Sequence, residues 1–184
     1  MRLAVDEVAT PIGLVRLAVD DDRICALAFD DGWRRRVTWL ERRFGTIELV
    51  PADDPAGATS RLEAYFAGAL DALDAIAVDP GGTAFQQRVW SALRRVPRGR
   101  TVSYRDLATT VGAPAAVRAV GAANGANPVG IVIPCHRVIG TDGGLTGYGG
   151  GLWRKRWLLD HEQAVPQHEP WRGTQLSFPV APRP

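Results

Sequence analysis

The segment Ile133–Val138 holds the residues of this chain that are best suited to do chemistry. It places Cys135 after a proline and directly before His136 and Arg137. A thiol attacks other atoms as its thiolate, and a neighbouring imidazole or guanidinium lowers the pKa of a thiol. The segment therefore predicts a reactive cysteine with a histidine beside it.

Metal and disulfide chemistry are not expected. The two cysteines, Cys25 and Cys135, lie far apart and form no C-x-x-C pair, and the chain has 3 histidines. A disulfide scaffold or a cysteine-based zinc site needs more such residues at closer spacing. Cys25 lies inside an apolar run, where a cysteine is usually an inert core residue. We predict neither a metal nor another cofactor.

Membrane insertion and secretion are not expected either. No apolar run approaches the roughly 20 residues of a transmembrane helix. Asp6 and Glu7 interrupt the N-terminal segment before the apolar region of a signal peptide could form. The sequence thus predicts a cytoplasmic protein with no membrane partner.

The net charge of +2 conceals two halves of opposite sign. Residues 1–82 carry 9 basic and 15 acidic side chains, whereas residues 83–184 carry 13 and 5. A basic C-terminal half suits a polyanion such as nucleic acid. Because 21 of the 22 basic residues are arginine, a solvated surface in an arginine-rich chain accounts for the same numbers. Charge alone leaves both interpretations open.

The N-terminal half begins with a β pattern. Apolar runs at 14–19 and 24–29, joined by an aspartate cluster, indicate strands within residues 1–30. Asp30-Asp31 is expected to cap a helix over roughly 33–44.

A loop, a second helix and a boundary complete this half. Residues 48–57 are expected to form the loop, and Thr59 or Ser60 to cap a helix that reaches Leu70. A short strand is predicted at 75–78. The turn-forming residues 79–82 mark the best domain boundary, because the charge changes sign there.

The C-terminal half indicates a helix-turn-helix. A helix from Phe85 to Val96 precedes a second one that Ser103 caps and that runs to Val111. After the turn at 112–114, residues 115–123 form a third, alanine-rich helix. Arg118 is the only charged residue of that helix, so it would project into a bound duplex or, alternatively, into solvent.

The nucleophile is expected at the end of a buried strand. That strand is predicted over Val129–Ile133, just before Cys135. A glycine-dense loop at 140–151 surrounds Tyr148, a closing helix covers 154–162, and an extended, proline-rich tail follows. We predict a scaffold domain at residues 1–80, an active domain at 81–162 and a tail at 163–184.

Pro134–Val138 matches, in every position, the active-site motif of the O6-alkylguanine-DNA alkyltransferase family, also called methylated-DNA–protein-cysteine methyltransferases. Further segments resemble the family in order and spacing: Phe85–Trp90, Val102–Tyr104, Arg118–Gly121, Asn127-Pro128 and Gly147-Tyr148. The resemblance is strong over about residues 83–162. It is weaker in the N-terminal half, where it rests mainly on Thr10–Gly13 and Tyr65–Gly68.

The resemblance implies an α/β (α+β) fold. In this family a small, ribonuclease H-like N-terminal sheet domain with helices precedes a mostly helical, winged helix-turn-helix-like domain. Such proteins bind double-stranded DNA in the minor groove and flip an alkylated guanine into a pocket, because a stacked base is out of reach of a buried thiol. The alkyl group then passes irreversibly to the cysteine, once per protein molecule, without a cofactor.

The resemblance also assigns roles to individual residues. Cys135 would be the nucleophile, His136 its base acting through a water, and Glu162 the group that orients the imidazole. Arg118 would fill the gap that the flipped base leaves. The remaining assignments are catalytic for Tyr104 and Asn127, DNA contacts for Ser103, Ala119 and Arg137, and pocket contacts for Tyr148, Gly149 and Val138.

Some features depart from the family pattern or leave other functions open. Gly149 stands where many relatives have serine, and only Cys25 is available for the structural zinc site of some members. A cysteine hydrolase using Cys135 and His136, a module that binds alkylated DNA without transfer, and a transcription regulator are the alternatives. We expect a monomer in solution. Cooperative binding along DNA and the preferred alkyl group stay open.

Overall fold

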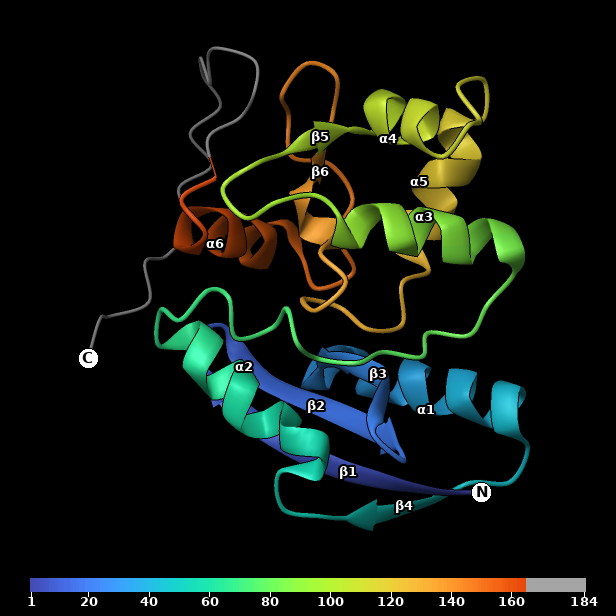
Figure 1. The fold of residues 1–184 in the computed structure, drawn as a ribbon, viewed down its shortest axis with the longest axis vertical. Coiled ribbons are helices and arrows are strands. Elements are labelled where there is room, and N and C mark those ends of the chain that lie inside the picture. The colour runs from blue at the N-terminus through green and yellow to red at the C-terminus, as the bar shows by residue number, and fades with distance from the viewer. Residues whose placement is uncertain (165–184) are drawn as a thin grey trace.

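The computed structural model describes residues 1–164, which form a sheet-containing lower part and a helical upper part (Figure 1). The sheet has the strand order β3-β2-β1-β4. Strands β1, β2 and β3 are successive antiparallel neighbours, and β4 pairs parallel to β1. Their bounds are Arg2–Thr10 for β1, Gly13–Asp20 for β2, Arg23–Phe29 for β3 and Glu48–Pro51 for β4.

The alternation of side chains along the strands gives the sheet two buried faces. In β2, Val15, Leu17 and Val19 belong to the main core. Ala18, between them, packs into a smaller cluster with Leu40 of helix α1 (Asp30–Phe44) and with Cys25. Burial raises the pKa of the Cys25 thiol to about 11, which fits the inert core role predicted for it.

The predicted strands and helices of the N-terminal half are present, with shifted helix ends. Helix α1 starts at Asp30. Phe29 occupies the N-cap position, and no side chain caps the helix with a hydrogen bond. Asp30 and Asp31 lie in the first turn instead, where a negative charge favours the helix dipole. Helix α2 (Ala58–Phe66) follows a short 3-10 turn, η1 (Pro55–Gly57), and is preceded by Gly57, not capped by Thr59 or Ser60.

Three further N-terminal predictions are wrong in detail. Helix α2 ends at Phe66 and does not reach Leu70. Residues 48–51, predicted as loop, form β4, because pairing with β1 supplies backbone partners that the local sequence does not reveal. The strand expected at 75–78 is reduced to a single parallel bridge between Val78 and Ile24.

The helix-turn-helix prediction is confirmed. Helix α4 (Tyr104–Thr110) packs against α5 (Val117–Gly125), and α5 packs against α3 (Ala84–Arg94). Ser103 caps α4 through a capping box: its Oγ accepts from the Asp106 backbone N at 3.1 Å, and Asp106 Oδ2 accepts from the Ser103 N at 3.1 Å. The upper elements are α3 Ala84–Arg94, β5 Val102–Ser103, α4 Tyr104–Thr110, α5 Val117–Gly125, η2 Cys135–Arg137, β6 Val138–Ile139 and α6 Leu152–His161.

The strand predicted at Val129–Ile133 is wrong, because these residues form a buried turn. The Ile133 N donates to Val129 O at 3.0 Å, and the Asn127 side chain bonds both Ile133 O (2.8 Å) and Val129 N (3.0 Å). Ile131 adopts a positive φ of 68°. Only Leu27 and Val129 keep a β-bridge. The side chain of Asn127 thus closes a turn within an apolar run.

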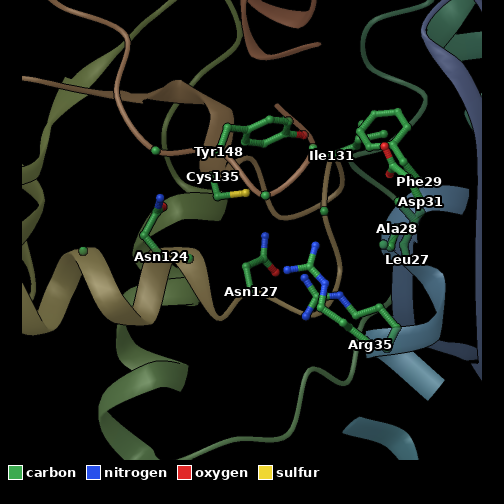
Figure 2. A pocket seen from close by; sticks show the side chains of 18 of the residues that line it. Leu27, Ala28, Phe29, Asp31, Arg35, Asn124, Asn127, Ile131, Cys135 and Tyr148 are labelled. Atoms are coloured by element: carbon green, nitrogen blue, oxygen red, sulfur yellow. The ribbon is translucent and has the colours of Figure 1, made fainter. Parts of the chain in front are cut away.

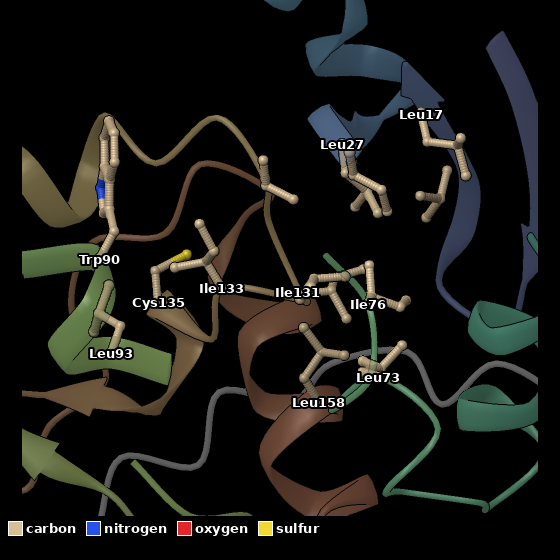
Figure 3. Close-up of a cluster of buried hydrophobic side chains, with 14 of the residues drawn as sticks. Leu17, Leu27, Leu73, Ile76, Trp90, Leu93, Ile131, Ile133, Cys135 and Leu158 are labelled. Carbon is tan, nitrogen blue, oxygen red and sulfur yellow. The ribbon is translucent and has the colours of Figure 1, made fainter. Parts of the chain in front are cut away.

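One hydrophobic cluster extends through both halves of the described chain. Figure 3 shows Leu17 and Leu27 of the sheet, Leu158 of α6 and Trp90 of α3 around the segment that carries Ile131 and Cys135. Within residues 1–164, no helix is long and apolar enough to cross a membrane. The predicted tail lies outside the described residues, apart from its first two positions.

Candidate active site

Cys135 lies at the start of the short 3-10 turn η2 and is 8% exposed. It lines a cavity of about 320 Å³ that both halves of the chain enclose. Tyr104, Asn127 and Tyr148 line it from the C-terminal half, and residues of β3 and α1 from the N-terminal half (Figure 2). The sulfur of Cys135 points into this cavity.

The Cys135 thiol is protonated at rest. Burial raises its pKa, although the Asn127 side chain and the charges of Lys155 and Arg36 act in the opposite direction. A buried thiol of this kind needs a base when it attacks. The adjacent His136, hydrogen-bonded to the carboxylate of Glu162, is the candidate for this base.

His136 is fully buried and held by one ring nitrogen. Its Nε2 lies 3.1 Å from Glu162 Oε1, whereas its Nδ1 has no hydrogen-bond partner among residues 1–164. An ionised carboxylate only accepts, so Nε2 carries the proton and Nδ1 presents a free lone pair. Burial lowers the pKa of His136, more than Glu162 raises it, and keeps the ring neutral.

Glu162 follows the last turn of α6 and is surrounded by donors. Arg137 binds it with both Nε and Nη2, each at 2.8 Å, and the Tyr65 hydroxyl donates to Oε1 at 2.8 Å. Burial opposes ionisation, but the hydrogen bonds from His136 and Arg137 and the charge of Arg137 outweigh it, so the pKa of Glu162 lies well below its usual value. The carboxylate is therefore fixed and charged. Tyr65 comes from α2, so the N-terminal half takes part in holding it.

Arg137 was expected to contact DNA, and its placement contradicts that expectation. The residue is 8% exposed, and its guanidinium is engaged by Glu162 and by Val96 O, which accepts from Nη1 at 2.6 Å. A buried charge needs such partners, since leaving it unpaired costs several kcal/mol. Arg137 is thus part of the structure that supports His136.

Two tyrosines, Tyr104 and Tyr148, line the cavity from two different segments. Tyr104 begins α4 directly after the capping residue Ser103, and β5 pairs in parallel with β6 next to the cysteine turn. Burial raises the pKa of Tyr104 despite hydrogen bonds with Thr146 and Asn124, and it raises the pKa of Tyr148 well above its ordinary value. Both phenols therefore keep a proton to donate.

Comparisons with known proteins agree with this geometry. Residues 84–164 match the family model described as 6-O-methylguanine DNA methyltransferase, DNA binding domain. A methylated-DNA–protein-cysteine methyltransferase of Salmonella typhimurium is 46% identical over 166 residues, which cover 88% of this chain and 96% of the relative. The chain belongs to the methylated-DNA–protein-cysteine methyltransferase family.

Two further relatives extend the likeness over both halves. The methyltransferase of that name from Mycolicibacterium paratuberculosis is 49% identical over 163 residues, covering 89% of this chain and 92% of its own. The crystal structure of Mycobacterium tuberculosis OGT in complex with DNA has a TM-score of 0.72 and 41% identity, covering 89% of this chain and 93% of that one. The α/β fold predicted from the family motifs is therefore confirmed.

The expected DNA-binding residues divide between surface and interior. Arg118 and Ala119 are exposed at the start of α5. Ser103 is buried, and its hydroxyl caps α4 and donates to Asp106 Oδ2 at 2.7 Å. A side-chain contact of Ser103 with DNA is therefore not supported by its placement.

The remaining predicted pocket residues lie around the cysteine. Gly149 lines the cavity, and a Cβ added there would meet nothing within 4 Å, so the absence of a serine leaves free space. Val138 is buried in β6, and its carbonyl accepts from Lys155 Nζ at 2.5 Å. Val138 is not among the residues that line the cavity.

Sequence reasoning missed Lys155, which is fully buried in α6. Its ammonium also donates to Thr146 O at 2.7 Å and thereby joins the glycine-dense loop to β6. Burial lowers the pKa of Lys155 to about 8, although Cys135 opposes the shift. The sequence contained one indication that this residue is special, because Lys155 is the only lysine of the chain. Among the described residues, no cluster of three or more His, Cys, Asp or Glu could hold a metal ion.

Proposed function

We propose that this protein repairs O6-alkylguanine in double-stranded DNA by moving the alkyl group to Cys135. The observation that carries the proposal is the arrangement of Cys135 and His136. The thiol faces a cavity, and the adjacent His136 has a free Nδ1 while Glu162 fixes its Nε2. These groups correspond to the nucleophile, base and orienting carboxylate of a covalent transfer site.

In the proposed reaction, Cys135 Sγ attacks the first carbon of the O6 substituent. The S–C bond forms as the C–O6 bond breaks, and the electron pair stays on the guanine oxygen. The thiol proton passes to His136 Nδ1 through a water, and the purine anion takes up one proton from water at N1, so that neutral guanine forms. A thioether is a poor substrate for reversal, so one protein molecule repairs one lesion and guanine is restored in the DNA.

Tyr104, Tyr148 and Gly149 would receive the flipped base. The protonated Tyr104 hydroxyl is suited to donate to guanine N3 and stabilise the departing purine. Tyr148 lines the pocket, and the backbone N–H of Gly149 lies in the loop that would approach O6. The resemblance to the family adds a contact from the guanine amino group to the backbone carbonyl of Val138. Asn127 acts indirectly by holding the turn that precedes Cys135.

Helix α5 would insert at the DNA minor groove. The exposed surface at its start combines small side chains with one cation, Arg118, which suits close approach to a duplex. Arg118 would take the place of the flipped base, and Ala119 would permit the approach. We propose that residues 1–80 serve as a supporting domain, and that the protein acts as a monomer in the cytoplasm.

Intact-protein mass spectrometry tests the proposal. Incubation with a duplex that contains O6-methylguanine should add one methyl group to the protein, and Cys135→Ala should stay unmodified. Repair of the DNA without a change in protein mass would indicate a turnover enzyme such as a hydrolase. Binding without transfer would indicate a recognition module, and either result would reject the proposal.

A further inference from the structure

Helix α1 brings two arginines to the cavity of the reactive cysteine. Arg35 and Arg36 line it together with Cys135, although they lie about a hundred residues away in the sequence. Figure 2 shows Arg35 entering from α1 on the side opposite Tyr148. Arg36 is half-buried and close enough for its charge to act on the Cys135 thiol.

Neither guanidinium has an ion pair or a hydrogen bond within residues 1–164. The contrast with other arginines of the site is clear, because Arg137 is paired with Glu162 and Arg154 with Asp31. Asp31 also lines the cavity, but its carboxylate is the partner of Arg154 at 2.7 Å. Burial lowers the pKa of Arg36, with Cys135 opposing, yet an arginine stays charged at neutral pH. The cavity therefore contains unneutralised positive charge.

The space around Cys135 extends toward this charge. Gly130, Gly149 and Gly150 line the cavity without side chains, and a Cβ at Gly149 would meet nothing within 4 Å. An O6 substituent must place its first carbon at Cys135 Sγ for the attack. Any atoms beyond that carbon then occupy the remaining space, which the α1 arginines border.

We propose that Arg36, with Arg35 beside it, makes the cavity a site for O6-alkylguanines whose alkyl group carries a negative charge, such as a carboxymethyl group. The inference rests on the proposed repair function and names a substrate class for it. The guanidinium would bind the carboxylate through charge-assisted hydrogen bonds while Cys135 Sγ attacks the methylene carbon. The C–O6 bond breaks, the thiol proton goes to His136, and the products are S-carboxymethylcysteine and guanine.

The test compares two duplexes that differ only in lesion charge. One contains O6-carboxymethylguanine, and the other contains the neutral analogue O6-carbamoylmethylguanine. Single-turnover rate constants for both are measured from the mass of the alkylated protein. The rate constant for the charged lesion is divided by that for the neutral lesion. Effects of a substitution on thiol reactivity or DNA binding act on both lesions and therefore cancel in this ratio.

Arg36→Gln should lower this ratio about tenfold relative to the unmodified protein, as expected for losing a partly exposed bond to a charged group. The double change Arg35→Gln/Arg36→Gln should lower it further. Arg34→Gln is the matched control, since Arg34 is exposed on the same helix and does not line the cavity, and it should keep the ratio.

Equal ratios in all four proteins would overturn the inference. Reaction with both lesions slowed by the same factor would also overturn it, because Arg36 would then act on the Cys135 thiol and not on the alkyl group. Reaction with O6-methylguanine is measured in parallel. If the wild-type protein transfers the methyl group but the Arg36 variants keep the wild-type charge ratio, only the inference is rejected. If the wild-type protein transfers no methyl group, the proposed function itself is rejected.

Discussion

The chemistry of the cysteine depends on which groups carry protons. Burial keeps the Cys135 thiol protonated and His136 neutral, while Arg137 holds Glu162 as the carboxylate. The sequence showed the thiol and the imidazole side by side, but adjacency does not fix a tautomer. The hydrogen bond from Nε2 to Glu162 does, and it leaves Nδ1 free to accept a proton. We therefore expect His136, and not a preformed thiolate, to control reactivity.

The rate of alkyl transfer should accordingly be flat around neutral pH, below the pKa of about 8 of Lys155, and fall in acid. Because the pKa of His136 is lowered, the base is lost only below its ordinary value of about 6.5. The measurement is the second-order rate constant for reaction with free O6-benzylguanine from about pH 5 to about pH 9, which shows how the rate depends on the protonation of His136. A steady rise through the alkaline range would instead show that thiol ionisation alone controls the reaction.

Protein stability should decline over the same acid range. The unfolded state takes up protons at His136 below about pH 6.5 and at Glu162 below about pH 4.5, whereas both pKa values are lower in the folded protein. Stability is thus present above these values and lost as pH falls through them. Urea unfolding at pH 7 and pH 5 measures the difference, and equal or greater stability at pH 5 would contradict the assignment.

At the scale of elements, what could be predicted depends on how local its cause is. Ser103 caps α4 with groups three residues away, so the sequence predicted that helix start. The β4 strand needs β1, and the turn at Val129–Ile133 needs the Asn127 side chain, so local periodicity missed the first and misassigned the second. The same limit applies to the site. Cys135 and His136 are neighbours in the sequence and could be predicted together, whereas Arg36 and Lys155 are brought to the cysteine only by the tertiary fold.

The capping box of α4 should matter for both stability and repair. Ser103→Ala removes the cap and should destabilise the protein by about 1 kcal/mol. It should also slow repair, since Tyr104 is the first residue of the helix. Thr83→Ala is the matched control: it removes the capping box of α3, away from the cavity residues, and should cost similar stability without slowing repair. Equal rates in both variants would contradict the positioning role of α4.

Helix α5 should matter for duplex DNA only. Arg118→Ala removes the exposed cation at its start, so repair of O6-methylguanine in a duplex should slow at least tenfold, on the order of the few kcal/mol needed to unstack a base. Reaction with free O6-benzylguanine should hardly change, because no base has to be replaced. Equal losses on both substrates would exclude a role of Arg118 in extruding the base.

At the scale of the whole molecule, the two halves form one site. The cavity has walls from β3 and α1 as well as from the C-terminal half, and Tyr65 of α2 bonds the carboxylate that orients His136. Arg154 joins the halves directly. It donates to Ile12 O at 2.9 Å, Gly150 O at 3.1 Å and Asp31 at 2.7 Å, and it lies 4.1 Å from the centre of the Phe29 ring. The N-terminal half is therefore more than a remote scaffold.

Arg154→Ala should loosen the glycine-dense loop and destabilise the protein by about 2 kcal/mol, the combined scale of its hydrogen bonds and ring contact. Transfer from duplex DNA and from free O6-benzylguanine should slow alike, because Gly149 and Gly150 line the cavity. Arg23→Ala is the control. Its pair with Asp22 is exposed, so urea unfolding should shift by less than about 0.5 kcal/mol. Matching effects of the two changes would contradict the role of Arg154.

The stoichiometry of repair distinguishes a protein that is alkylated once on Cys135 from an enzyme that turns over. The protein is titrated with excess duplex that contains O6-methylguanine, and the amount of restored guanine is measured per mole of protein. Peptide mass spectrometry then locates the methylated residue. We expect one guanine restored per protein molecule, with the methyl group on the peptide that contains Cys135 and no reaction after a second addition of substrate. Repeated turnover, or a methyl group on any other residue, would contradict it.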